Sequence, residues 1–152
     1  MNKYRLDTSD KIQVGGRTLH RIIAIRDFDG VKAGDKGGYI ESERNLSHEG
    51  SCWVHGNAQV YEDALVYGYA QVFGDVIVFG DVIVFGYARL FGNARVAGNA
   101  RVAGNACVYG NARLFGNARV AGNARVAGNA CVYGNARLFG NARVAGNARV
   151  AG

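Results

Sequence analysis

A glycine recurs on one register of six residues from Gly50 to the end of the chain. Of the 23 glycines, 17 lie on this register, and only Glu62 interrupts it. A period of six matches no helical repeat, and each glycine would cost a helix about 1 kcal/mol relative to alanine. Collagen is excluded too, because it needs glycine at every third position and abundant proline, and this chain has no proline. The spacing therefore predicts short strands joined by glycine corners.

The hexads share the form G-N-A-R-V-A. A Val or Leu recurs every six residues from Val54 to Val150, and two residues before it stands a small residue, usually alanine. Positions two apart lie on the same side of a strand, so both should point inward while the residue between them points outward. Gly-Asn supplies the corner, since both residues tolerate left-handed backbone angles. This pattern is typical of a parallel β-solenoid.

The hexad Val96-Ala97-Gly98-Asn99-Ala100-Arg101 resembles the motif of hexapeptide-repeat left-handed β-helices. The resemblance covers residues 50–152, which are 103 of the 152 residues. It implies an all-β fold, a left-handed parallel β-helix with three hexads in each triangular coil and between five and six coils in all. Neighbouring coils should lie about 4.8 Å apart.

The chain divides into an N-terminal β cap at residues 1–49 and a β-solenoid at residues 50–152. Within the cap, Lys11–Val14 and Arg17–Ile25 read as two strands joined by a Gly15–Gly16 turn. Val31–Gly38 is expected to form a loop, and Leu46–Glu49 to enter the solenoid register. A cap is needed because a bare solenoid end exposes strand edges and apolar core.

RIIAIRDF, VKAGDKGGYIESERNLSHEGSCWV and the following GNA repeats resemble bacterial and prophage proteins labelled hypothetical or putative transferase. Acyltransferases of similar fold use a histidine base beside coenzyme A or an acyl carrier, so the resemblance makes His55 a weak candidate catalytic base. No acid follows Asp81 to orient such a base. Active sites also require local exceptions, and the repeats after residue 87 show none. We therefore expect no cofactor, with coenzyme A bound only in the acyltransferase alternative.

The charge is divided sharply along the chain. Residues 1–81 hold 9 Lys+Arg and 12 Asp+Glu, which gives −3, whereas residues 82–152 hold 9 arginines and no acid, which gives +9. Such asymmetry points to anionic partners. All nine arginines occupy the outward position before the aliphatic residue: Arg89, Arg95, Arg101, Arg113, Arg119, Arg125, Arg137, Arg143 and Arg149.

With coils of 18 residues, these arginines form three columns that place like charges about 4.8 Å apart. An anion lying along a face would relieve the repulsion and release counterions. Aromatic residues recur at the other outward position, from Tyr61 to Phe139, and basic and aromatic groups together suit phosphates and exposed bases. Three interpretations stay open for this surface. The arginines keep the protein soluble while their aliphatic stems cover the outer sheet, or they bind a polyanion, or they contact a host protein.

Cys52, Cys107 and Cys131 are odd in number and form no CxxC pair, so we expect neither a disulfide framework nor a metal site. Cys107 and Cys131 should lie in different columns. The absence of 18 consecutive apolar residues argues against a membrane span, and a cytoplasmic location is the default expectation.

The sequence stops in mid-pattern at Val150, Ala151 and Gly152, with no polar cap. We expect a homo-oligomer formed through this end, with side-by-side packing of rods or a truncated chain as alternatives. The first functional hypothesis is a non-catalytic, self-associating scaffold or binding protein. A hexapeptide-repeat acyltransferase is the alternative, and a binder of nucleic acid or another polyanion is the third possibility.

Overall fold

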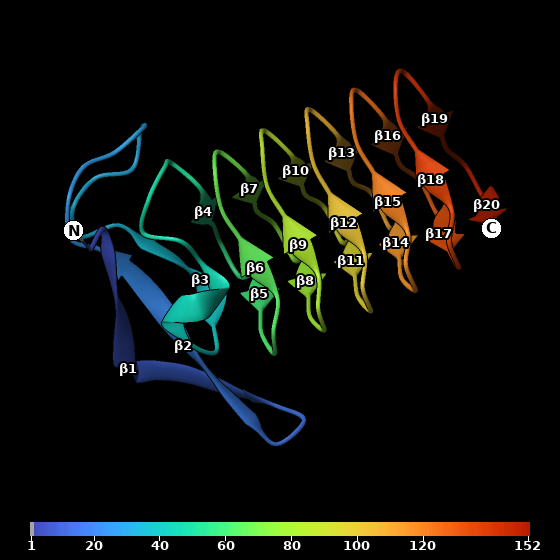
Figure 1. Cartoon of the computed structure of the whole chain (residues 1–152). Coiled ribbons are helices and arrows are strands. Elements are labelled where there is room, and N and C mark those ends of the chain that lie inside the picture. The colour runs from blue at the N-terminus through green and yellow to red at the C-terminus, as the bar shows by residue number, and fades with distance from the viewer. Residues whose placement is uncertain (1) are drawn as a thin grey trace.

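The computed structural model describes residues 2–152 and shows a rod of stacked coils with a β cap at its N-terminal end (Figure 1). Consecutive strands of the rod lie in different sheets, and each pairs in parallel with strands three positions away. The six strands of one sheet mark six coils. The described residues contain no α-helix. The prediction of an all-β parallel solenoid is confirmed, and the structure is consistent with left-handed winding.

The rod has three faces, which we number by their sheets. The first face belongs to a nine-stranded sheet that begins in the cap, and the second and third faces have six and five strands. The first sheet comprises β1 (Tyr4–Val14), β2 (Arg17–Ala24), β3 (Lys36–Ile40), β5 (Gln59–Val60), β8 (Ile77–Val78), β11 (Arg95–Val96), β14 (Arg113–Leu114), β17 (Cys131–Tyr133) and β20 (Arg149–Ala151).

The other two sheets lie wholly within the rod. The second face comprises β4 (Trp53–Val54), β7 (Gln71–Val72), β10 (Arg89–Leu90), β13 (Cys107–Val108), β16 (Arg125–Val126) and β19 (Arg143–Val144). The third face comprises β6 (Leu65–Val66), β9 (Ile83–Val84), β12 (Arg101–Val102), β15 (Arg119–Val120) and β18 (Arg137–Leu138). A single 3₁₀ turn, η1 (Glu43–Asn45), precedes the first full coil of the rod.

The core of the rod consists of one small and one aliphatic residue from each hexad. Ala100 and Val102 are fully buried, whereas Arg101 between them is exposed. This alternation continues along the rod as far as Leu138 and confirms the predicted inward and outward positions, whereas Ala148 in the last coil is exposed. Burying the apolar residues of every coil in one continuous core is the main stabilising contribution, at about 25 cal/mol per Å² of apolar surface.

Backbone hydrogen bonds join each coil to the next. On the third face, the amides of Asn99, Arg101 and Ala103 donate to carbonyl oxygens of the following coil over 2.7, 2.9 and 2.9 Å. The same pattern recurs on the other faces, so neighbouring coils are held at strand spacing throughout.

The corner glycines satisfy two conditions at once. Gly104 has φ of +65°, and a Cβ built on it would lie 2.8 Å from the nitrogen of Gly122 in the next coil. Glycine is therefore required both for the left-handed backbone and for the close approach of stacked corners. Gly140 has a similar φ of +70°, but a Cβ built on it would have no neighbouring atom within 4 Å.

Glu62, the exception to the glycine register, also adopts a left-handed conformation, with φ of 61°. Its amide donates to Glu41 Oε1 over 2.8 Å, and its carbonyl accepts from Asn45 Nδ2 over 3.1 Å. Asn45 is fully buried and also donates to the Ala64 carbonyl over 2.8 Å. Contacts with the segment that precedes the rod therefore hold residue 62 in the corner conformation without glycine.

The cap is a hairpin followed by a strand that joins the rod. β1 and β2 pair antiparallel around Gly15–Gly16, which confirms the predicted turn, although β1 begins at Tyr4 rather than Lys11. The prediction that Val31–Gly38 is entirely a loop is wrong, because β3 begins at Lys36. Gly38 permits this strand to lie close to the rod, since a Cβ there would stand 2.5 Å from the Ala58 carbonyl oxygen.

Parallel stacking begins before Gly50, where the sequence analysis placed the start of the solenoid. Tyr39 and Ile40 pair in parallel with β5, and Leu46 forms a bridge with Val66. Leu46 is fully buried, as its predicted entry into the register requires. The segment from β3 to Leu46 is thus both the end of the cap and the first stacked layer of the rod.

Trp53 and Lys3 close the N-terminal end of the core. Trp53 occupies an outward position but is buried, because Phe28 packs against it edge-on at 5.2 Å. Lys3 is fully buried, and its Nζ donates to the Cys52 carbonyl over 2.6 Å and the Gly50 carbonyl over 3.2 Å. Burial lowers the pKa of Lys3 below its usual value. The cap thus gives hydrogen-bond partners to carbonyl groups at the end of the rod.

Arg21 fastens the hairpin to the rod. Its Nε donates to Asp10 Oδ2 over 2.8 Å, and its Nη1 donates to the Gly37 and Gly56 carbonyls over 2.8 and 3.0 Å. The Tyr39 hydroxyl donates to the other oxygen of Asp10 over 3.0 Å. These donors, Arg21 first, lower the pKa of Asp10. One guanidinium therefore joins β1, β3 and the first complete coil.

Substituting Gly104 by alanine should destabilise the rod more than substituting Gly140. Gly140→Ala measures the left-handed penalty alone, which is roughly 1–2 kcal/mol, whereas Gly104→Ala adds the contact with the next coil. The midpoints of urea unfolding of the two variants would test this. Equal losses would show that the approach of stacked corners contributes nothing.

The Asp10–Arg21 contact should make cap stability dependent on acid pH. The folded-state pKa of Asp10 is lowered, so the stability that it contributes is present above the unfolded-state pKa and is lost as pH falls through the folded-state value, below about pH 4. Asp10→Asn should lower the thermal midpoint at about pH 7, and the difference from wild type should shrink towards about pH 2. A difference that is unchanged by acid would contradict this role.

Candidate anion-binding surface

The nine arginines of the rod lie where the hexad pattern places them, each as the first residue of its strand. Strand pairing sets them in three columns, as predicted. Two columns are interrupted by a cysteine, and the third is not. The columns are Arg89, Cys107, Arg125 and Arg143 on the second face; Arg95, Arg113, Cys131 and Arg149 on the first; and Arg101, Arg119 and Arg137 on the third.

None of these nine guanidinium groups forms an ion pair within residues 2–152. The five ion pairs of the described chain all join residues between Asp10 and Asp63. Repulsion between stacked arginines is therefore offset only by solvent, salt or a bound partner.

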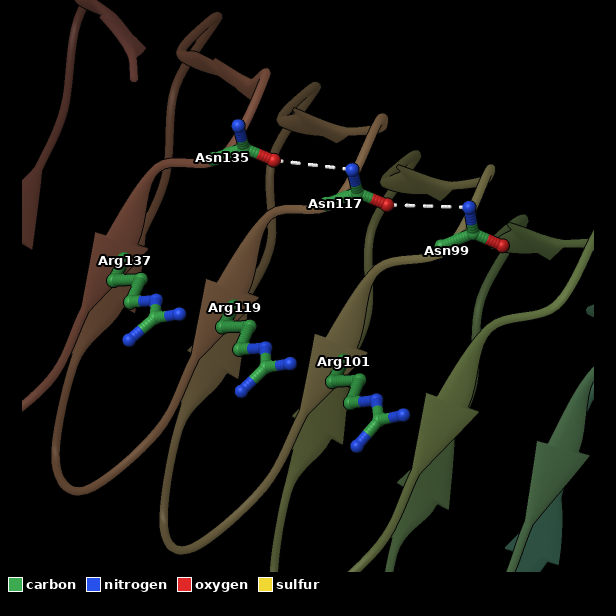
Figure 2. Close-up of a pocket in the computed structure, with 6 residues that line it drawn as sticks. All are labelled: Asn99, Arg101, Asn117, Arg119, Asn135 and Arg137. Carbon is green, nitrogen blue, oxygen red and sulfur yellow. Dashed lines mark hydrogen bonds between the residues drawn. The ribbon is translucent and has the colours of Figure 1, made fainter.

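The third face carries the most regular array. Arg101, Arg119 and Arg137 run beside a ladder formed by Asn99, Asn117 and Asn135, and the six side chains line a groove of about 270 Å³ (Figure 2). Each ladder amide donates one N–H to the oxygen of the next amide, over 3.1 and 3.0 Å. An asparagine amide has two N–H donors, so one donor per coil stays free beside the arginine column.

The corner asparagines stack from coil to coil on all three edges of the rod. The amide-to-amide distances range from 3.0 to 3.3 Å. The ladder therefore fixes the side chains that border each arginine column.

The outward aromatic residues stack in short columns with gaps. Phe73, Phe91 and Tyr109 form the longest column, with ring centroids 5.1 and 4.8 Å apart. Tyr67–Phe85 on the third face and Phe115–Tyr133 on the first are stacked pairs at 5.2 and 5.3 Å. Alanines interrupt these columns, as Ala103 and Ala121 do after Phe85 on the third face, so the aromatic columns are less continuous than the arginine columns.

His55 lies at the N-terminal end of the second face. Its Nε2 is 2.7 Å from Gln71 Oε1, and Gln71 Nε2 donates to the Ser51 carbonyl over 3.0 Å. Because the amide oxygen must accept, this network assigns a proton to Nε2 of His55. A hollow of about 290 Å³ beside the ring is lined by His55, Gln71, Phe73 and Arg89. It contains no carboxylate.

Gln71 and the tyrosines Tyr69 and Tyr87 were not among the site residues predicted from the sequence. All three stand at outward or corner positions of the second face, where later coils carry arginine, cysteine or asparagine. The departure of G-Y-A from the usual G-N-A was the signal that could have identified the two tyrosines.

The remaining predicted positions have simple surroundings. Val150 is half-buried and Ala151 and Gly152 are exposed in and after β20, which pairs with β17; assembly through them stays a prediction. Cys107 and Cys131 are free and lie in different sheets, as expected. Among residues 2–152, no cluster of His, Cys, Asp and Glu could hold a metal ion, and no helix is long and apolar enough to cross a membrane.

Three segments of the rod match the YdcK Beta solenoid repeat. They are residues 88–104, 112–128 and 136–152. Their starts are 24 residues apart, which is the length of an internal duplication: residues 92–115 recur unchanged as 116–139. This family match confirms, independently of the structure, that the rod is a repeat solenoid.

The chain is also similar to a protein of Escherichia coli (strain K12) named "Uncharacterized acetyltransferase YdcK". The two are 42% identical over 62 residues, which cover 36% of this chain and 19% of that relative. The match thus spans about a fifth of the relative's length. It supports a shared solenoid and leaves the activity of this chain to be proposed.

Arg119→Gln should raise the thermal midpoint at low salt, because Arg119 stands between Arg101 and Arg137 in the uninterrupted column. The gain should vanish near about 1 M salt, where the Debye length is about 3 Å. Arg137→Gln is the matched control, since it relieves contact with one arginine instead of two and should gain less. A loss of stability at both salt concentrations would show that stem packing outweighs repulsion.

Proposed function

We propose that the protein is a non-catalytic β-solenoid scaffold that binds a linear anionic partner along the third face. The observation that carries the proposal is the uninterrupted column of Arg101, Arg119 and Arg137 beside free amide donors. The scaffold would act in the cytoplasm of a bacterium or a prophage host.

The physical basis is the uncompensated charge of the rod. A partner whose negative groups lie along the rod axis could contact one guanidinium per coil, at a spacing of about 4.8 Å. Each contact would relieve repulsion between neighbours and release counterions. Asn99, Asn117 and Asn135 would add hydrogen-bond donors that cannot be titrated. The rigid ladder holds these donors in place before binding, which reduces the ordering entropy.

Acyl transfer is the alternative that the name of the E. coli relative suggests. It would require a histidine base and an acyl donor such as coenzyme A. His55 has a hollow beside it, but its partner is the neutral amide of Gln71 rather than a carboxylate. Such an amide orients the ring but lacks the negative charge with which a carboxylate supports a histidine base. The geometry therefore favours binding over this chemistry.

The triple variant Arg101→Gln, Arg119→Gln, Arg137→Gln should lose affinity for long-chain inorganic polyphosphate, a probe without rings or bases. For wild type, three contacts and about 0.7 released counterions per contact predict that affinity falls about 20-fold between about 50 and 200 mM salt. Fluorescence anisotropy of labelled polyphosphate would measure both effects. The triple variant should bind more weakly at low salt and show a shallower salt dependence.

The control is Arg95→Gln, Arg113→Gln, Arg149→Gln, which removes the same charge from the first face, where Cys131 interrupts the column. It should retain most of the affinity. If both triple variants lose the same affinity for polyphosphate, binding depends on net charge and not on the third face. If the wild-type protein does not bind polyphosphate at low salt, the proposal is wrong.

A further inference from the structure

The second face departs from the repeat at one corner. Tyr69 and Tyr87 stand where the same column later carries Asn105 and Asn123. Their rings stack at 4.8 Å with planes 8° apart, and 51% and 59% of their surfaces are exposed. An exposed tyrosine stack here replaces the amide ladder, and neither the solenoid core nor the coil-to-coil backbone bonds require it.

The C-terminal end of this stack is open. The next residue in the column is Asn105, so no ring covers that face of Tyr87, and a hollow of about 230 Å³ lies there. Tyr87, Arg89, Asn105 and Cys107 line it. A flat ring placed on Tyr87 would continue the stack by one member.

The groups around the open ring face suit an anion. Arg89 lines this hollow and forms no ion pair or side-chain hydrogen bond with the described residues, and no acid lines the hollow. A second hollow runs along the side of the stack, where Tyr69, Tyr87 and Arg89 line it together with Asp29, and the carboxylate makes it less suitable for an anion. The hollow between Tyr87 and Asn105 is therefore the one that combines an open ring face and the Arg89 guanidinium with a lining free of carboxylates.

Asn105 adds a hydrogen-bond acceptor at the same place. In the ladder, each amide oxygen accepts from the asparagine one coil earlier, as Asn123 accepts from Asn105 over 3.3 Å. Asn105 is the first asparagine of its column, because position 87 is tyrosine. No described residue donates to its Oδ1, which by the ladder's direction faces the coil of Tyr87. An amino group on a stacked ring could donate to it.

We propose that Tyr87, Arg89 and Asn105 form a binding site for a nucleotide whose base carries an exocyclic amino group. The base stacks on Tyr87, the phosphate contacts Arg89, and the amino group donates to Asn105 Oδ1. A free nucleotide and an unpaired nucleotide of a single strand present the same chemistry. This site lies on the second face and shares no residue with the arginine groove of the third face. Either binding proposal can therefore fail without affecting the other.

The chain's own repeats provide conservative variants. Tyr87→Asn introduces the residue found one coil later, and Arg89→Gln introduces the residue of the preceding coil, Gln71. Isothermal titration with AMP should show binding that weakens about tenfold or more in Tyr87→Asn, as expected for loss of one stacked base. Arg89→Gln should weaken it as well. Tyr133→Ala, which removes a stacked aromatic from the first face, is the control and should bind normally.

Two further ligands test the individual contacts. Orthophosphate should bind at least about tenfold more weakly than AMP, because it lacks the stacking ring. IMP differs from AMP in carrying a carbonyl group in place of the amino group, and it should bind more weakly. Equal affinity for AMP and IMP would overturn the role of Asn105.

Cysteine alkylation gives a second readout that is specific to the site. Cys107 and Cys131 lie in identical GNACVYG segments and are both half-buried, but only Cys107 lines the hollow at Tyr87. AMP should slow iodoacetamide modification of Cys107 and leave Cys131 unchanged, with the protection lost in Tyr87→Asn. Mass spectrometry of the two peptides would measure this.

Equal protection of both cysteines, or unchanged AMP affinity in Tyr87→Asn, would overturn the proposal. Oligo(dA) that binds in a Tyr87-dependent manner while AMP does not would support the site and assign it to nucleic acid. Failure of both probes to bind or to protect Cys107 at millimolar concentration would exclude it.

Discussion

The stacking of corners at strand spacing is the constraint on which the rest of the molecule depends. A corner must turn the chain with left-handed backbone angles and lie against the corner of the next coil, and Gly104 meets both requirements. Once corners stack, each hexad presents one small and one aliphatic residue to the core. Every residue also lies beside the residue 18 positions away, except near the cap. The fold therefore converts a sequence repeat into columns of like side chains.

This conversion explains why the electrostatics are so uneven. In a globular protein, two arginines separated by a long stretch of chain rarely stand side by side, but in a solenoid with an 18-residue coil they do so by construction. Asparagine columns benefit, because one amide donates to the next. Arginine columns do not, because a guanidinium only donates. The same geometry thus produces a self-satisfied ladder and, beside it, a row of charges without partners.

The rod was predictable because its residues obey one local rule, whereas in the cap only the local Gly15–Gly16 hairpin and the entry of Leu46 were predictable, because the other contacts join distant segments. The hexad pattern gave the buried positions, the arginine columns and the different faces of Cys107 and Cys131. It could not show that Trp53 is buried by Phe28, or that Glu62 keeps a corner conformation with help from Asn45. β3 was missed because its glycines signal a loop by composition, whereas Gly38 is needed for close approach to the rod.

One of the two candidate sites follows from the sequence repeat, and the other follows from a departure from it. The arginine columns follow from the repeat and could be placed from the sequence alone, although the groove beside them required the orientation of the amides. The Tyr87 hollow arises from an interruption of the repeat, and its acceptor on Asn105 is free because the residue one coil earlier is a tyrosine that cannot continue the amide ladder. In a solenoid, repeated residues create extended surfaces for repeating partners. Departures from the repeat leave unpaired donors, acceptors and ring faces, and such local groups are what recognition of a small ligand requires.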